Sequence, residues 1–180
     1  GPLGEYAQMG IKLAVAHVNA NGGAGGRQVE LVMEDSVNPP TASTKAERMF
    51  ERDQVDMIIG EISSASGLTI SQVAARYGKC FVNTGGNSDS LRGQDCNRYM
   101  FHVETQNSMY VNAEGQFFKS QNLVDGKNWY TMTADYAFGH DLLAAAKAFL
   151  DANGGVIAGE DLVPTDATDF SSYLLKIRQA

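Results

Sequence analysis

The chain has 180 residues, with 14 Lys and Arg against 21 Asp and Glu and a formal net charge of −7. Phosphate backbones need clustered Lys and Arg, which this acidic sequence lacks, so nucleic acid is not an expected partner. No run of about 18 apolar residues predicts a transmembrane helix. No signal-peptide pattern opens the chain, so we expect any such peptide to have been removed or to lie outside this sequence. With 43% hydrophobic residues, the sequence can build a real core.

A short sequence occurs twice. Asn21-Gly22-Gly23 and Asn153-Gly154-Gly155 each follow a helical pattern and precede a strand pattern, 132 residues apart. Glycine accepts the left-handed backbone that ends a helix. Two copies in one context predict two lobes on one plan, with lobe one at 1–122 and the beginning of lobe two at 123–180. The offset also predicts a fragment truncated at both ends, without the first strand of lobe one and the remainder of lobe two.

Helix and strand patterns alternate along the chain. The helical spacing predicts helices over 6–20, 44–52, 68–77, 109–121, 137–152 and 170–179. Short apolar runs predict strands over 29–33, 55–59, 80–83, 99–103, 128–133 and 156–163. Strands of this kind are buried on both faces, which predicts an α/β fold: lobes that are parallel-sheet three-layer sandwiches. Ligands of such sheets bind beyond the carboxyl ends of the strands, so the loops there are the candidate site.

The loop at 60–67 is the first candidate. It leaves a strand end, enters a helix N-terminus and carries Ser63, Ser64 and Ser66. Backbone N–H groups and hydroxyls at such a position suit a carboxylate. The alternative is that Ser64 or Ser66 only caps the helix.

Two further loops follow later strands. The loop at 84–88 contains Gly85 and Gly86, which would let a ligand approach the backbone, and the alternative is an ordinary turn. The loop at 134–139 carries aromatic residues that could wall a pocket. Its alternative is that Phe138, spaced four residues from Leu142, belongs to the helix core.

Signals of enzyme chemistry are weak. Gly23-Ala24-Gly25-Gly26 joins a helix to a strand, whereas phosphate binding needs a strand-to-helix loop. There is no Walker sequence, no nucleophile elbow and no cysteine pair at metal spacing. No spacing supports a triad of His140, an aspartate and a loop serine. We therefore expect a protein that is not an enzyme, without catalytic residues, cofactor or metal.

Cys80 and Cys96 enclose a short excursion between two strand patterns. A disulfide between them is expected in an oxidising compartment. The alternative is two unpaired thiols, because pairing requires a Cα geometry that sequence does not show.

Several stretches, each loose alone, occur in a specific order and spacing. In chain order they are 1–10 with 19–23, 34–35 with 40–50, 55–60 leading into 63–64, 135–139, and 168–170. Together they resemble the type I periplasmic binding proteins. Within these, the resemblance is to the branched-chain amino-acid-binding (Leu/Ile/Val-binding-like) branch of the substrate-binding proteins of ABC transporters. It covers essentially the whole chain.

The resemblance implies two hinged lobes that close on a small ligand. It implies that Ser64 holds the ligand's carboxylate and that Gly85 and Asn87 supply the next contacts. The family often has Ala and Thr at these two positions, so the ligand stays open between an amino acid and an aromatic acid or amide. The expected ligand-binding residues are Tyr6, Ser63, Ser64, Gly85, Gly86, Asn87, Asp135, Tyr136 and Phe138.

The expected function is that of an extracytoplasmic solute-binding protein of an ABC importer, with a membrane permease as its partner. The alternative is a ligand-sensing domain of a receptor or regulator on the same fold. The resemblance implies a periplasmic or extracellular location, with a lipid anchor in a Gram-positive organism. A broken sheet edge is also expected to favour self-association of the fragment.

Overall fold

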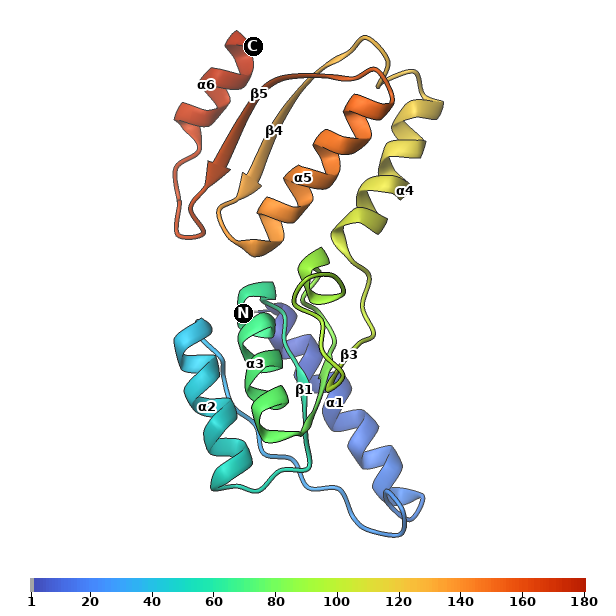
Figure 1. The fold of residues 1–180 in the computed structure, drawn as a ribbon, viewed down its shortest axis with the longest axis vertical. Helices are drawn as coiled ribbons and strands as arrows, with labels where there is room; N and C mark the ends of the chain where they lie inside the picture. The colour runs from blue at the N-terminus through green and yellow to red at the C-terminus, as the bar shows by residue number, and fades with distance from the viewer. Residues whose placement is uncertain (1) are drawn as a thin grey trace. The chain divides into compact units, whose positions relative to one another are not determined.

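The computed structural model describes residues 2–180, and the chain forms two compact units (Figure 1). Unit 1 contains Gly1–Gly85 and Asn97–Val103, and unit 2 contains Gly86–Cys96 and Glu104–Ala180. Gly1 lies outside the described residues. The chain therefore passes from one unit to the other three times, after residues 85, 96 and 103.

Unit 1 is built on a parallel sheet with strand order β1-β2-β3. Its elements are α1 (Pro2–Ala20), α2 (Pro39–Glu51), β1 (Met57–Gly60), α3 (Ser64–Tyr77), β2 (Cys80–Asn83) and β3 (Met100–His102). Ile58 pairs with Phe81, and Val82 pairs with Phe101. This register aligns the carboxyl ends of β1 and β2, so the loops that follow them lie at the same edge of the sheet.

The core of unit 1 lies between the sheet and the helices α2 and α3. Phe50 of α2, Val73 of α3 and Phe81 of β2 are buried there together. Both helices begin earlier than predicted, α2 at Pro39 instead of 44 and α3 at Ser64 instead of 68, whereas the end of α3 at Tyr77 agrees with the prediction. The Asn38 side chain accepts a hydrogen bond from the N–H of Thr41 at 2.9 Å, and α3 ends at Gly78 with φ of 62°.

The strand predicted at 29–33 is wrong. Residues 28–37 have no strand assignment, since no strand within residues 2–180 pairs with them. A strand depends on ladder hydrogen bonds to a neighbour, whatever its own propensity. The side chain of Asn19 replaces such a neighbour at one residue. Its Nδ2 donates to the carbonyl of Val29 at 2.9 Å, and its Oδ1 accepts from the N–H of Val29 at 2.7 Å.

Unit 2 has a two-stranded parallel sheet of β4 and β5. Its elements are the 3-10 helix η1 (Asp89–Leu91), α4 (Asn107–Ser120), β4 (Asn128–Ala134), α5 (Ala137–Ala152), β5 (Val156–Val163) and α6 (Ser171–Gln179). Val124, Phe149 and Leu150 form its buried core. The predicted α/β fold with parallel sheets is confirmed in both units. No helix among residues 2–180 is long and apolar enough to cross a membrane.

The boundary between the units differs from the one predicted after residue 122. Residues 104–122 belong to unit 2, because α4 lies along α5 (Figure 1). Val111 and Phe118 of α4 pack against the core residue Phe149 and its neighbours. A Cβ atom on Gly115 would lie 2.5 Å from the ring of Phe149, so the two helices approach closely at this glycine. This apolar contact decides which unit α4 joins.

Candidate functional site

The loop after β1 leads directly into α3. Gly60 ends the strand with φ of +143°, and its carbonyl accepts a hydrogen bond from the N–H of Thr84 at 3.0 Å. Ser63 is the N-cap of α3, and its Oγ accepts from the N–H of Ser66 at 3.5 Å. Ser64 is the first residue of the helix and is 1% exposed. The capping role weighed for Ser64 or Ser66 therefore falls to Ser63.

Sequence reasoning missed Glu61, which lies in the same loop. Its Oε1 accepts hydrogen bonds from the N–H groups of Ile62 at 2.8 Å and Ser63 at 2.9 Å. The loop thus already holds a carboxylate of its own beside the N-terminus of α3. An acidic residue placed directly between a strand end and a helix start is the signal that could have revealed it. Its negative charge would repel any anion that binds at the N-terminus of α3.

Gly85 brings the loop after β2 against the loop after β1. A Cβ atom at this position would lie 2.9 Å from the carbonyl oxygen of Glu61 and 3.2 Å from the Cα of Ile62. Contacts that short with backbone atoms are not sustained without movement. The glycine was predicted to let a ligand approach the backbone, but in unit 1 it is the neighbouring loop that comes close.

In unit 2, the segment after Gly86 is attached to the start of α4. Asn87 Nδ2 donates to the carbonyl of Thr105 at 2.7 Å, and the Asn87 carbonyl accepts from the N–H of Asn107 at 2.9 Å. Ser88 is fully buried, and its Oγ donates to the carboxylate of Asp141 on α5. The sequence showed Asn87 as a candidate but carried no signal for Asn107, which lies far from it along the chain.

The aromatic residues of the loop after β4 form a stacked pair. The ring centroids of Tyr136 and Phe138 are 5.9 Å apart, with an interplanar angle of 29°. Burial raises the pKa of the Tyr136 hydroxyl above its usual range, because the charged phenolate is poorly solvated there. Phe138 is half-buried and is absent from the core cluster of unit 2. The role of these two rings as the wall of a ligand pocket stays a prediction.

Asp135 and His140 form an exposed pair at the start of α5. His140 Nε2 lies 2.8 Å from Asp135 Oδ1. No serine hydrogen-bonds to His140 within residues 2–180, so a Ser-His-Asp arrangement is not assembled there. The described part of the chain also contains no group of three or more His, Cys, Asp or Glu side chains that could hold a metal ion.

Tyr6 lies on α1 and is 69% exposed. It makes no hydrogen bond or ring contact within the part of the chain that the structure describes. Its ligand contact stays a prediction.

Cys80 belongs to unit 1 and Cys96 to unit 2. Both cysteines are free thiols, with Cys80 half-buried at the start of β2 and Cys96 exposed in the turn before β3. The disulfide expected between them stays a prediction, because pairing requires closely spaced Cα atoms and suitable Cβ directions.

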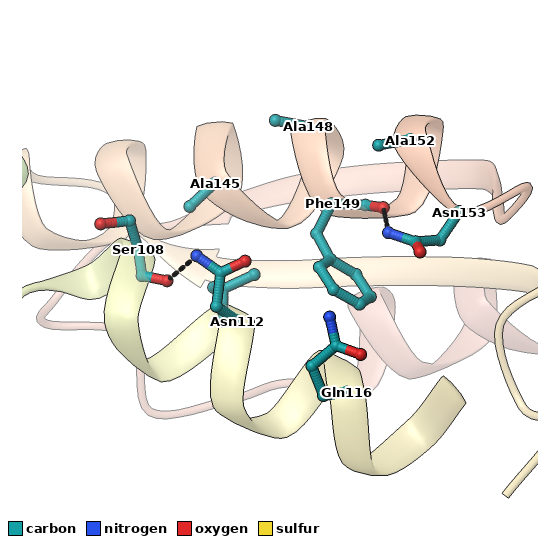
Figure 2. A pocket seen from close by; sticks show the side chains of 9 residues that line it. Ser108, Asn112, Gln116, Ala145, Ala148, Phe149, Ala152 and Asn153 are labelled. Carbon is teal, nitrogen blue, oxygen red and sulfur yellow. Dashed lines mark hydrogen bonds between the residues drawn. The ribbon is translucent and has the colours of Figure 1, made fainter. Parts of the chain in front are cut away.

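A groove also lies between α4 and α5 in unit 2, with a volume of about 300 Å³ (Figure 2). Ser108, Asn112 and Gln116 line one side, and Ala148 and Phe149 line the other. Asn112 Nδ2 donates to the carbonyl of Ser108 at 2.7 Å on the α4 side. None of the predicted ligand-binding residues lines this groove, so it is separate from the candidate site.

Comparisons with known proteins agree with this architecture. The family described as "Periplasmic binding protein" matches residues 1–180. "Leu/Ile/Val-binding protein homolog 8" of Brucella abortus (strain 2308) is 28% identical over 183 residues, covering 98% of this chain and 45% of the relative. This chain thus spans about half the length of the curated relatives it matches.

Two solved structures show the same fold. A periplasmic binding protein from Burkholderia mallei has a TM-score of 0.86 and 34% identity, covering 94% of this chain and 44% of its own. A solute-binding protein of an ABC transporter from R. palustris, in complex with benzoate, has a TM-score of 0.88 and 23% identity over 99% of this chain and 48% of its own.

Two parallel-sheet units, with polar loops at the strand ends, are the architecture of a binding protein of the periplasmic type. The chain belongs to the periplasmic binding protein family. Its relatives place it in the type I, branched-chain amino-acid-binding branch of ABC transporter substrate-binding proteins. Members of this family and the relatives named above are binding proteins.

Proposed function

We propose that this protein is an extracytoplasmic solute-binding protein of an ABC importer, which delivers a small carboxylate-bearing solute to a permease in the membrane. The observation that carries the proposal is the family match over residues 1–180. A relative's name, "Leu/Ile/Val-binding protein homolog 8", points in the same direction. The role requires reversible binding and no bond-making step.

Each candidate loop would contact a different part of the solute. Ser64 and the backbone N–H groups at the start of α3 would hold the carboxylate, as helix N-termini do for anions. Gly85, Gly86 and Asn87 would supply further polar contacts. The stacked Tyr136 and Phe138 would cover the apolar part of the solute.

Ligand class is proposed at the level of an amino acid or an aromatic acid or amide. Asp135 is exposed at the start of α5 and would accept a hydrogen bond from an amino or amide group. Its present partner, His140, is also exposed, so exchange of that partner for a solute group exposes no buried charge.

A thermal-shift screen of the full-length protein tests the proposal. The panel pairs each amino acid or aromatic acid with an analogue in which a hydroxymethyl group replaces the carboxylate, so that the negative charge is lost and the rest of the molecule is kept. A ligand that binds only the native state raises the apparent free energy of unfolding, by about 2.7 kcal/mol at a concentration of 100 times its Kd. The unfolding midpoint rises as a result. Carboxylates should shift the midpoint and their analogues should not. No shift with any carboxylate, or equal shifts within the pairs, would contradict it.

A further inference from the structure

Asn107 connects two of the loops that carry predicted ligand contacts in unit 2. It is the first residue of α4 and is fully buried. Its backbone N–H donates to the carbonyl of Asn87 at 2.9 Å, and its side-chain Nδ2 donates to the carbonyl of Phe138 at 2.7 Å. One residue therefore holds the segment after Gly86 on one side and the start of α5 on the other.

Further hydrogen bonds connect residues 87–89 to the start of α4. Asn87 Nδ2 donates to the carbonyl of Thr105 at 2.7 Å, so Asn87 is attached to the segment entering α4 at two points. The carboxylate of Asp89 accepts from the Ser108 N–H at 3.1 Å and from its Oγ at 2.9 Å. These bonds join residues 87–89 to α4, whereas the Asn107 amide joins α4 onward to Phe138.

The amide of Asn107 is only half satisfied. Its Oδ1 is buried and has no hydrogen-bond partner. A buried acceptor without a partner costs stability of the same order as a hydrogen bond contributes. This cost offsets part of what the hydrogen bond to Phe138 contributes to the stability of unit 2. What its donor supplies is the position of the Phe138 carbonyl relative to α4.

We propose that Asn107 is a positioning residue for solute binding, which holds Asn87 and Phe138 in one fixed arrangement before the solute arrives. The inference rests on the proposed function for its binding readout. Preorganised contacts raise affinity because less conformational freedom is lost on binding. Asn107 itself need not touch the solute, since its side chain is buried among the elements that it joins.

The test compares Asn107→Ala with Asn112→Ala in the full-length protein. Asn112 lies on the same helix, and its side chain also donates to a backbone carbonyl, at 2.7 Å, but it is exposed. For the solute with the largest thermal shift, Asn107→Ala should raise the Kd measured by calorimetry about tenfold. The unfolding midpoint of each variant without solute is measured alongside, because truncating a fully buried side chain also leaves a cavity that lowers stability. Asn112→Ala should alter neither quantity.

Hydrogen exchange without solute provides a second readout. Asn107→Ala removes the Nδ2 donor but keeps the backbone N–H that binds the Asn87 carbonyl, so amide exchange should become faster at the start of α5 and stay unchanged at 87–88. Asn112→Ala should change exchange at neither segment. If no solute binds the wild-type protein, the proposed function fails and exchange still decides the role of Asn107. Should Asn107→Ala not fold, Asn107→Leu replaces it, since leucine fills a similar volume without a donor or an unpaired acceptor. An unchanged Kd with unchanged exchange, or a lowered midpoint with an unchanged Kd, overturns the inference.

Discussion

Gly85 and the carbonyl oxygen of Glu61 are too close for any side chain at position 85: an added Cβ atom would lie 2.9 Å from that oxygen. The Cα of Ile62 would be 3.2 Å away. Both neighbours are backbone atoms, which cannot turn aside as the tip of a long side chain can. The loops that follow β1 and β2 can therefore pack against each other only because position 85 has no side chain.

Gly85→Ala should destabilise unit 1 by about 1–3 kcal/mol, the usual cost of forcing a methyl group into a packed site. Denaturant unfolding of the full-length protein measures the change. Gly10→Ala is the control, because an added Cβ on this α1 residue meets nothing within 4 Å. In a helix interior that change should stabilise by roughly 0.5–1 kcal/mol. A Gly85→Ala protein as stable as the wild type would show that the loops separate freely.

Ser64→Ala should weaken binding of a carboxylate solute by about 1–3 kcal/mol, the range for a hydrogen bond to a charged group. Calorimetry on the full-length protein gives the Kd. Ser120→Ala is a matched control at the end of α4, where the hydroxyl donates to the carbonyl of Phe117 at 2.7 Å and is exposed. Equal affinities in wild type and Ser64→Ala would remove Ser64 from the carboxylate site.

Glu61→Gln should tighten binding of a solute whose only charge is a carboxylate. Glutamine keeps an oxygen that can accept the N–H groups of Ile62 and Ser63, but it removes a negative charge beside the start of α3. We expect a gain of roughly threefold to tenfold in affinity, about 1 kcal/mol for a partly screened charge near a protein surface. The gain should shrink as salt rises.

The exposed Glu114 on α4 provides the charge-matched control for that experiment, as Glu114→Gln. Calorimetry at two ionic strengths compares the two variants. Weaker or unchanged binding in Glu61→Gln would mean that the carboxylate of Glu61 does not face the bound anion.

Asp161 should make the stability of unit 2 sensitive to acid. Its carboxylate accepts from Lys176 Nζ at 2.5 Å and from the Tyr130 hydroxyl at 2.5 Å. These bonds, first that of Lys176, hold the pKa of Asp161 below its usual value of 3.8. A carboxyl with a lowered folded-state pKa contributes stability above its unfolded pKa, and this contribution is lost as the pH falls through the folded value.

The unfolding midpoint of the wild type should therefore decline below pH 3.8 more steeply than that of Asp161→Asn. Thermal scans at pH values from about 2 to 6 follow both proteins across that window. The control is Asp166→Asn, which changes an exposed carboxylate that makes no hydrogen bond within residues 2–180. Its unfolding midpoint should vary with pH in the same way as that of the wild type. Parallel curves for wild type and Asp161→Asn would contradict the assignment.

Local patterns predicted much of this molecule. The alternation of helix and strand runs indicated parallel sheets, and the glycine-rich helix ends were located because a left-handed residue has few alternatives to glycine. Gly22 and Gly154 have φ of 95° and 77° at the two repeated turns. The loops at the strand ends were found from the sequence because their position follows from the topology of a parallel sheet.

Contacts between distant residues decided the rest. The residues at 29–33 have strand composition but no pairing partner, and α4 joins unit 2 because Phe149 packs against it. Position 85 requires glycine because the backbone of Glu61 lies too close for a side chain. Asn107 is important because it donates hydrogen bonds to the carbonyls of Asn87 and Phe138. Sequence by itself determined the family, the fold class and the candidate loops, since these depend on local propensity and order. Only the tertiary structure decided which groups touch, because packing and hydrogen bonds join residues that no periodicity relates.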